Sequence, residues 1–302
     1  MTNEQKFNNL SVPSHPIDVI LDTDAYNEID DQFAIAYLLK NSDKLNVKAI
    51  YAAPFHNEKS SDPCDGMIKS YEEIFKVLEL MGKKVSVING SPRFLPNENK
   101  AVISDAASHL ARTAMEYTPD NPLYVVAIGA ITNIASAILQ KPEITENIVV
   151  VWLGSNALHY HDTKEFNLMQ DIAAARVVIS SGVPFVILPC MGVVSAFTLS
   201  HAEIKEWLLG KNPLATYLGE NTITAAEAYA KGKPWTRVIW DVTAVAWLLN
   251  DGERFMRSQI VELPLPGYDH KYEKGEKTYP VRYVYHIWRD SLMRDLIEKL
   301  CK

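Results

Sequence analysis

Six short apolar runs, rich in Val and Ile, recur through the first two thirds of the chain and constrain its fold more than any other feature. Continuous apolar runs of this length are typical of strands that are buried on both faces, as in a parallel sheet. The runs are IDVIL (17–21), VKAIYAA (47–53), KVSVI (84–88), PLYVVAI (122–128), NIVVVWL (147–153) and PFVILP (184–189).

Segments with helical spacing of apolar residues separate these runs. They are 31–40, 71–81, 104–117, 132–140 and 173–181. Strands that alternate with helices predict an α/β fold with a doubly wound, mostly parallel central sheet and helices on both faces. In such open sheets ligands bind at the carboxyl ends of the strands, so we expect functional residues directly after the strand runs.

The pattern changes after residue 200, where helical segments predominate. These segments are 201–209, 214–231 and 241–249. A stretch with few apolar residues, 267–280, predicts a hairpin or a loop, and 287–300 predicts a closing helix. Because no Gly/Ser-rich or Pro-rich linker divides the chain, we expect one domain over 1–302. In that domain, 1–16 would be an N-terminal extension and 200–302 a helical C-terminal part.

Composition excludes several classes of protein. The chain of 302 residues has 30 Lys and Arg against 37 Asp and Glu, and a net charge of −7 argues against a nucleic acid partner. Cys64, Cys190 and Cys301 are far apart and form no CxxC, which favours reduced thiols. The first residues lack the apolar core of a signal peptide, and the longest mostly apolar stretch, 123–139, is too short to cross a membrane. We therefore expect a soluble, cytoplasmic protein.

Four aspartates follow the first apolar run within ten residues, in the string DTDAYNEIDD. Asp22 and Asp24 end the expected strand, whereas Asp30 and Asp31 begin the expected helix. Helix capping accounts for Asp30 and Asp31 but leaves Asp22 and Asp24 unexplained. Like charges this close repel one another unless a cation neutralises them. The cluster therefore predicts a divalent metal site, and oxygen ligands favour Ca²⁺ or Mg²⁺ over Zn²⁺.

At these residues the chain resembles the nucleoside hydrolases of the inosine–uridine preferring type, whose first strand is followed by D-x-D-x-G-x-D-D. The string here is two residues longer between its Asp pairs and lacks the Gly. Further segments resemble the family in the same order along the chain. They are Asn57 after the second strand, IGAITNIASAI (128–138), KEFN (164–167) and TRVIWDVTAVAWLL (236–249).

The resemblance implies Ca²⁺-dependent hydrolysis of the N-glycosidic bond of a ribonucleoside, which releases free base and ribose, as in purine salvage. Asp24 would be both a metal ligand and the catalytic base that activates a metal-bound water. The other metal ligands implied are Asp31, the backbone carbonyl of Ile128 and Asp241. The residues implied to bind the sugar are Asp30, Asn57, Glu165 and Asn167. Family members are usually dimers or tetramers, so the resemblance also implies a homo-oligomer.

The residues near the leaving base depart from part of the family. Trp240 stands before Asp241, where pyrimidine-tolerant members carry His and purine-specific members carry an aromatic residue. Trp240 therefore either stacks on a purine or fills the core. Tyr26, in the longer loop, either covers the site or lies on the surface, and Cys190 is expected to be a small apolar filler. The histidines best placed to reach a leaving base are His109, His159 and His161.

Two other functions remain open at the level of sequence. A strand followed by D-x-D also occurs in haloacid-dehalogenase-type phosphatases, although Asp30 and Asp31 follow too soon for that family. The second open function is that of a nucleoside- or ribose-binding protein that keeps the metal site but is catalytically weak. A nucleotide-binding dehydrogenase is disfavoured because the chain has no GxGxxG, and it has no GxxxxGK[ST], GxSxG or HExxH either.

Overall fold

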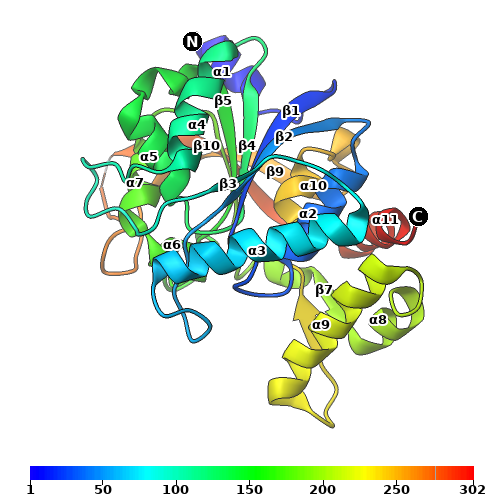
Figure 1. Ribbon diagram of the computed structural model, residues 1–302. Coiled ribbons are helices and arrows are strands. Elements are labelled where there is room, and N and C mark those ends of the chain that lie inside the picture. The colour runs from blue at the N-terminus through cyan, green and yellow to red at the C-terminus, as the bar shows by residue number, and fades with distance from the viewer. Residues whose placement is uncertain (276) are drawn as a thin grey trace.

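A sheet of eight strands forms the centre of the computed structural model, which describes residues 1–275 and 277–302 (Figure 1). The strand order is β3-β2-β1-β4-β5-β6-β10-β9, and neighbouring strands are parallel except β10 and β9. The strands are β1 (Ile17–Thr23), β2 (Leu45–Ala52), β3 (Val87–Asn89), β4 (Leu123–Ala127), β5 (Ile148–Leu153), β6 (Phe185–Leu188), β9 (Met256–Pro264) and β10 (Thr278–Ile287).

Helices cover both faces of this sheet (Figure 1). One face packs against α2 (Asp31–Lys40), α3 (Pro63–Met81), α10 (Val242–Trp247) and α11 (Arg289–Cys301). The other face packs against α4 (Asp105–Thr113), α5 (Thr132–Gln140) and α7 (Ile172–Ser180). Val19 and Leu21 of β1 belong to the first core and Ile20 to the second. Burial on both faces explains why the strand sequences are continuously apolar.

A smaller unit extends from the sheet beside α3 and α11 (Figure 1). It contains α8 (His201–Trp207), α9 (Pro213–Ala230) and a two-stranded antiparallel sheet of β7 (Thr198–Ser200) and β8 (Thr236–Val238). The chain also has an N-terminal helix, α1 (Asn3–Asn9), and a short helix after β5, α6 (Phe166–Gln170). None of the described helices is long and apolar enough to cross a membrane.

The predicted α/β fold class is confirmed, and each of the six predicted strands is present. Helix α3 begins at Pro63, earlier than the predicted residue 71. The Asp62 side chain caps its first turn by accepting from the Asp65 N–H, and Pro63 fits the first helical position. The helix ends at Gly82, whose φ of 60° is a conformation that glycine adopts without strain.

The C-terminal part contains the predicted helices and also strands that the sequence analysis did not identify, of which β9 and β10 are the longest. The predicted hairpin or loop at 267–280 lies mainly in the connection between β9 and β10. Strand β9 is the edge strand, and it escaped detection because its sequence MRSQIVELP mixes polar with apolar residues and has no continuous apolar run. Strand β10 pairs with β6, so the end of the chain completes the sheet.

The order of the strands identifies where a ligand is expected to bind. From β1 the chain proceeds outward through β2 to β3, whereas β4, β5 and β6 follow one another on the other side of β1. The strand order therefore reverses between β1 and β4. In open α/β sheets the crevice outside the carboxyl ends of the strands at such a point is the usual binding site.

Candidate active site

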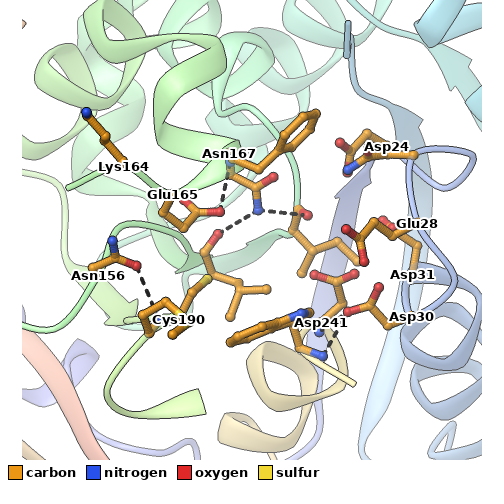
Figure 2. A pocket seen from close by; sticks show the side chains of 16 residues that line it. Asp24, Glu28, Asp30, Asp31, Asn156, Lys164, Glu165, Asn167, Cys190 and Asp241 are labelled. Carbon is orange, nitrogen blue, oxygen red and sulfur yellow. Dashed lines mark hydrogen bonds between the residues drawn. The ribbon is translucent and has the colours of Figure 1, made fainter. Parts of the chain in front are cut away.

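A pocket lies at this reversal point, beyond the carboxyl ends of β1, β4 and β5, with a cavity of about 230 Å³ (Figure 2). Carboxylates gather at one end of the pocket and Glu165 lies at the other (Figure 2). The structure brings eight of the nine predicted site residues into the wall of this pocket. They are Asp24, Asp30, Asp31, Ile128, Glu165, Asn167, Trp240 and Asp241.

Asp24 follows β1 and is buried in the pocket wall. Its Oδ2 has no hydrogen-bond partner among the described residues. A Cβ at Gly129, after β4, would lie 2.8 Å from Asp24 Oδ1, so this glycine allows the carboxylate to approach the backbone. Burial and the neighbouring negative charge of Asp31 raise the pKa of Asp24 well above its usual value.

Asp30, Asp31 and Asp241 form a buried triad whose carboxylate oxygens lie within 4.8 Å of one another. Thr23 Oγ1 donates to Asp31 Oδ1 at 2.5 Å, and the Trp240 N–H donates to Asp30 Oδ2 at 2.8 Å. Asp30 Oδ1 has no partner in the described part of the chain. The bond between Trp240 and Asp30 connects the start of α2 to the start of α10, although these helices are far apart in the sequence.

Burial is the main cause of the raised pKa values in this triad. It raises the pKa of Asp30 to about 8 and that of Asp31 to about 7, and the pKa of Asp241 is raised by burial and by the charge of Asp30. Buried carboxylates this close are stable only when protonated or when a cation neutralises them. The donor set is all oxygen, and the unpartnered oxygens of Asp24 and Asp30 add to it, so the residues fit a hard divalent cation.

The triad differs in one residue from the ligand set that the resemblance implied. Asp31 and Asp241 belong to both sets, whereas the structure groups Asp30 rather than Asp24 with them. The Ile128 carbonyl lines the pocket and accepts a hydrogen bond from Asn167 Nδ2 at 3.2 Å. Asp24 and Ile128 nevertheless lie in the same pocket wall as the triad.

Glu165 and Asn167 form the opposite wall and connect the ends of the strands. Glu165 caps α6 by accepting from the backbone N–H groups of Asn167 and Leu168, and it also accepts from the Ser155 N–H at 2.8 Å. Asn167 Nδ2 donates to Leu153 O at 3.0 Å as well as to Ile128 O. Burial raises the pKa of Glu165 to about 7. Both side chains are thus held by backbone groups in fixed positions.

Asn57 is the predicted site residue that the structure leaves outside the pocket wall. Its Nδ2 donates instead to Asn27 Oδ1 at 2.7 Å. Asn27, in the longer loop between the Asp pairs, lines the pocket where Asn57 was expected. The two extra residues in DTDAYNEIDD were the sequence signal that this wall would be rebuilt. The polar lining residues that sequence reasoning missed are Asn27, Glu28, Asn156 and Lys164.

Of the other residues considered near the leaving base, some line the pocket and some lie elsewhere. Cys190 lines the pocket, and burial raises the pKa of its thiol well above the usual value, so it is not a thiolate nucleophile. Tyr26 is 42% exposed and lies outside this pocket, in a neighbouring cleft. The pocket wall includes none of the three candidate histidines, and His109 Nδ1 instead contacts Tyr51 Oη at 2.7 Å.

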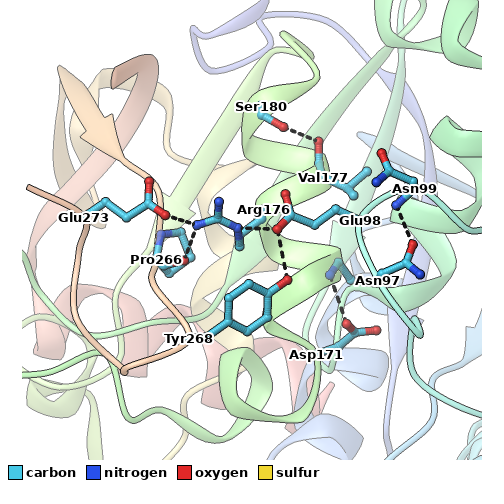
Figure 3. Close-up of polar contacts among 11 residues, drawn as sticks. Asn97, Glu98, Asn99, Asp171, Arg176, Val177, Ser180, Pro266, Tyr268 and Glu273 are labelled. Carbon is cyan, nitrogen blue, oxygen red and sulfur yellow. Dashed lines mark hydrogen bonds and ion pairs between the residues drawn. The ribbon is translucent and has the colours of Figure 1, made fainter. Parts of the chain in front are cut away.

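The β9–β10 connection supports the loop that carries Glu165. Tyr272 Oη lies 2.8 Å from Ser155 Oγ, and the His270 carbonyl accepts from the Thr163 N–H. Arg176 of α7 holds the connection from the other side, since it donates to the Pro266 carbonyl and to Glu273 (Figure 3). The C-terminal hairpin therefore holds two residues of the loop that precedes Glu165.

Replacing Tyr272 with Phe is expected to lower the free energy of unfolding by about 1 kcal/mol, because a buried hydrogen bond to Ser155 is lost. Urea denaturation measures the change. The matched control is Tyr268→Phe in the same connection, since the Tyr268 side chain is exposed and its bond to Glu98 should contribute almost nothing. Equal losses in the two variants would contradict the supporting role of Tyr272.

Comparison with known proteins identifies one family from sequence and the fold of that family from structure. The family model described as inosine-uridine preferring nucleoside hydrolase matches residues 19–283. A curated relative, the pyrimidine-specific ribonucleoside hydrolase RihA of Salmonella enteritidis, is 30% identical over 164 residues, which are 52% of this chain and 50% of the relative. The match thus spans about half the length of the curated relatives.

Solved structures show the same fold over nearly the whole chain. A plant nucleoside hydrolase has a TM-score of 0.74 at 16% identity, over 95% of this chain and 99% of that chain. The purine-preferring ribonucleoside hydrolase of Gardnerella vaginalis has a TM-score of 0.73 at 18% identity, over 94% of this chain and 98% of that chain.

Proposed function

Because this chain belongs to the inosine–uridine preferring nucleoside hydrolase family, we propose that it hydrolyses the N-glycosidic bond of a ribonucleoside. The products would be the free base and ribose. The proposal includes Ca²⁺ as the cofactor, a preference for purine nucleosides and Asp24 as the catalytic base. Its main support is the convergence of Asp24, Asp30, Asp31 and Asp241 in one buried pocket.

The chemistry of the bond explains why such a pocket is useful. Cleavage leaves positive charge on the ribose ring, and a wall of carboxylates stabilises that charge. Asp24 would take the proton of the attacking water, since it lines the pocket and its Oδ2 is free to accept.

Asp31, Asp241 and the Ile128 carbonyl, together with Asp24, would hold Ca²⁺. The triad geometry adds Asp30 as a further candidate ligand beside its proposed contact with a ribose hydroxyl. When bound, the ion orients the ribose hydroxyls and lowers the pKa of water. Ca²⁺ is favoured over Mg²⁺ because Ca²⁺ accepts a larger and less regular set of oxygen ligands.

The opposite wall would hold the rest of the sugar. Glu165 and Asn167 are fixed by backbone hydrogen bonds, so they offer their remaining oxygen lone pairs in set positions. Asn57 is proposed to act through Asn27, whose side chain it holds in the pocket wall.

The purine preference rests on Trp240, which lines the pocket and would stack on the base. The named relatives differ in this respect, since one is pyrimidine-specific and another is purine-preferring. A stacking side chain without a histidine beside it favours purines, whose larger ring system gains more from stacking.

We also propose that residues 1–302 act as one domain, because β10 from the end of the chain pairs with β6. We further propose that the protein is a dimer or tetramer.

The direct test is to incubate the protein with inosine, adenosine, guanosine, uridine and cytidine and to follow the release of reducing sugar. We expect ribose release that is fastest with purines, that a chelator abolishes and that Ca²⁺ restores better than Mg²⁺. Hydrolysis that is insensitive to the chelator would contradict the metal site. Ca²⁺ binding without release from any nucleoside would favour the alternative of a nucleoside- or ribose-binding protein. The phosphatase alternative has lost its support, because the family match covers residues 19–283.

A further inference from the structure

A second, larger cleft of about 700 Å³ lies beside the acidic pocket. The longer loop between the Asp pairs, helix α3 and helix α9 supply most of its wall. Asn27 and Glu28 line both cavities, so the cleft and the pocket meet at this loop. The loop that distinguishes this sequence from the family pattern therefore builds the partition between them.

Arg237 stands at this partition, on β8 and four residues before Asp241. Its Nη2 donates to Glu28 Oε2 at 2.6 Å, and the guanidinium carbon lies 6.0 Å from the centre of the Tyr229 ring. Its Nε–H is buried and has no acceptor among the described residues. A cation that lines the cleft thus has hydrogen-bonding capacity that the described protein groups do not use.

The same cleft offers an acceptor and aromatic surfaces. Gln32 is buried, and its Oε1 has no partner in the described chain. The other side chains that suit a planar ligand are Tyr26, Tyr217 and Tyr229. An unsatisfied donor, an unsatisfied acceptor and aromatic rings in one cleft are groups that suit the edge and the faces of a nucleobase.

The reaction requires a group of this kind. When the bond between C1′ and the ring nitrogen breaks, its electron pair stays on the nitrogen, while the water oxygen bonds C1′ and its proton passes to Asp24. The departing base carries negative charge until solvent protonates it. No histidine among residues 1–275 and 277–302 lines either cavity. Arg237 lines the cleft and is paired with Glu28, which lines both cavities.

We infer that the leaving base lies where the acidic pocket meets this cleft, and that the Arg237 guanidinium stabilises the negative charge on it. The inference rests on the proposed hydrolase function. It requires no proton transfer from Arg237, because a fixed cation and its N–H groups lower the energy of an anion directly. Trp240 and Arg237 come from one segment whose backbone Asp30 holds, so the first can stack on the ring while the second faces its edge.

The test compares two substrates in Arg237→Gln. Inosine has a poor leaving group that needs stabilisation, whereas 4-nitrophenyl β-D-ribofuranoside releases a stable phenolate. Removal of one preorganised donor lowers kcat about 10²- to 10³-fold in comparable sites, so we expect a loss of that size for inosine. We expect kcat for the aryl riboside to change less than about fivefold, since that leaving group needs no such donor.

Three variants control for a structural role. Arg257→Gln removes a guanidinium that is paired with Glu253 and lines neither cavity, and it should leave both rates nearly unchanged. Arg237→Lys keeps the charge and should lose less activity on inosine, which also provides a test if Arg237→Gln does not fold. Glu28→Gln removes the partner carboxylate and keeps the guanidinium, so inosine hydrolysis should fall far less than in Arg237→Gln.

Each result decides between the hypotheses. Equal losses for both substrates in Arg237→Gln, or an unchanged rate for inosine, would overturn the role of Arg237 while hydrolase function stands. Wild-type protein that hydrolyses inosine but not the aryl riboside would also overturn it, because a cleft of this size would then exclude an aromatic leaving group. Wild-type protein that hydrolyses neither substrate would refute the proposed function itself.

Discussion

Replacing Asp24 with Asn is expected to lower kcat for ribonucleoside hydrolysis about 10³- to 10⁴-fold. General-base catalysis alone contributes about 10²- to 10⁴-fold, and Asn accepts no proton from water. The variant also removes one proposed ligand of Ca²⁺. Because Asn has nearly the shape of Asp and carries no charge, it relieves the repulsion from Asp31. The metal-free variant should therefore melt no lower than the metal-free wild type.

The control is Asp18→Asn at the other end of β1, where the carboxylate contacts Asn46 and Tyr117 away from the pocket. Steady-state kinetics with inosine and a thermal melt of each variant give the comparison. If Asp24→Asn retained more than about a tenth of wild-type kcat, Asp24 would not be the catalytic base. If its melting temperature fell sharply, the loss of activity would instead reflect damage to the fold.

The position of Asp24 shows what sequence alone establishes well. A continuous apolar strand ends at Thr23, and the acids that follow must lie at the carboxyl edge of a parallel sheet. The same argument places Ile128 after β4 and Glu165 after β5. Strand ends are determined by local patterns, and the topology of the sheet then brings them together, so most of the pocket was predictable.

The longer loop shows where sequence reasoning failed. Asn57 follows the expected strand, yet Asn27 takes its expected place in the pocket wall, and Asn57 only holds it. The path of a loop depends on contacts with distant segments, such as the ion pair between Glu28 and Arg237. A local pattern does not encode such contacts.

The C-terminal hairpin shows a second limit of prediction from sequence. Strands β9 and β10 mix polar with apolar residues and contain no continuous apolar run like those of the inner strands. A search for continuous apolar runs does not detect such strands. Their support of the loop before Glu165, through Tyr272, was therefore also invisible in the sequence.

In the absence of metal, the stability of the folded protein is expected to fall as the pH rises from about 5.5 to about 8. Burial raises the pKa of Asp31 and of Asp22 to about 7 and that of Asp30 to about 8, whereas an unfolded Asp titrates near 3.9. The folded chain thus holds protons that the unfolded chain has released. A raised pKa gives stability that is complete below about pH 4 and is lost as the pH passes through 7 to 8.

The loss is large because several buried carboxylates contribute. Each unit of pKa shift corresponds to 1.36 kcal/mol, so a loss of several kcal/mol is expected across this range. For a chain of this size that corresponds to a fall in melting temperature of about 5 °C or more. Saturating Ca²⁺ should reverse the trend, because the ion binds the ionised carboxylates and its affinity rises with pH.

Calorimetric melts of metal-stripped protein at pH 5.5 and 8, each with and without Ca²⁺, measure both effects. The shift caused by Ca²⁺ should be several times larger at pH 8 than at pH 5.5. Asp31→Asn is the informative variant, since it removes one raised pKa and one proposed ligand together, and both the pH dependence and the Ca²⁺ shift should shrink. Equal melting temperatures of the stripped wild type at the two pH values would show that the triad does not hold its protons. The case that these carboxylates require a cation at neutral pH would then fail.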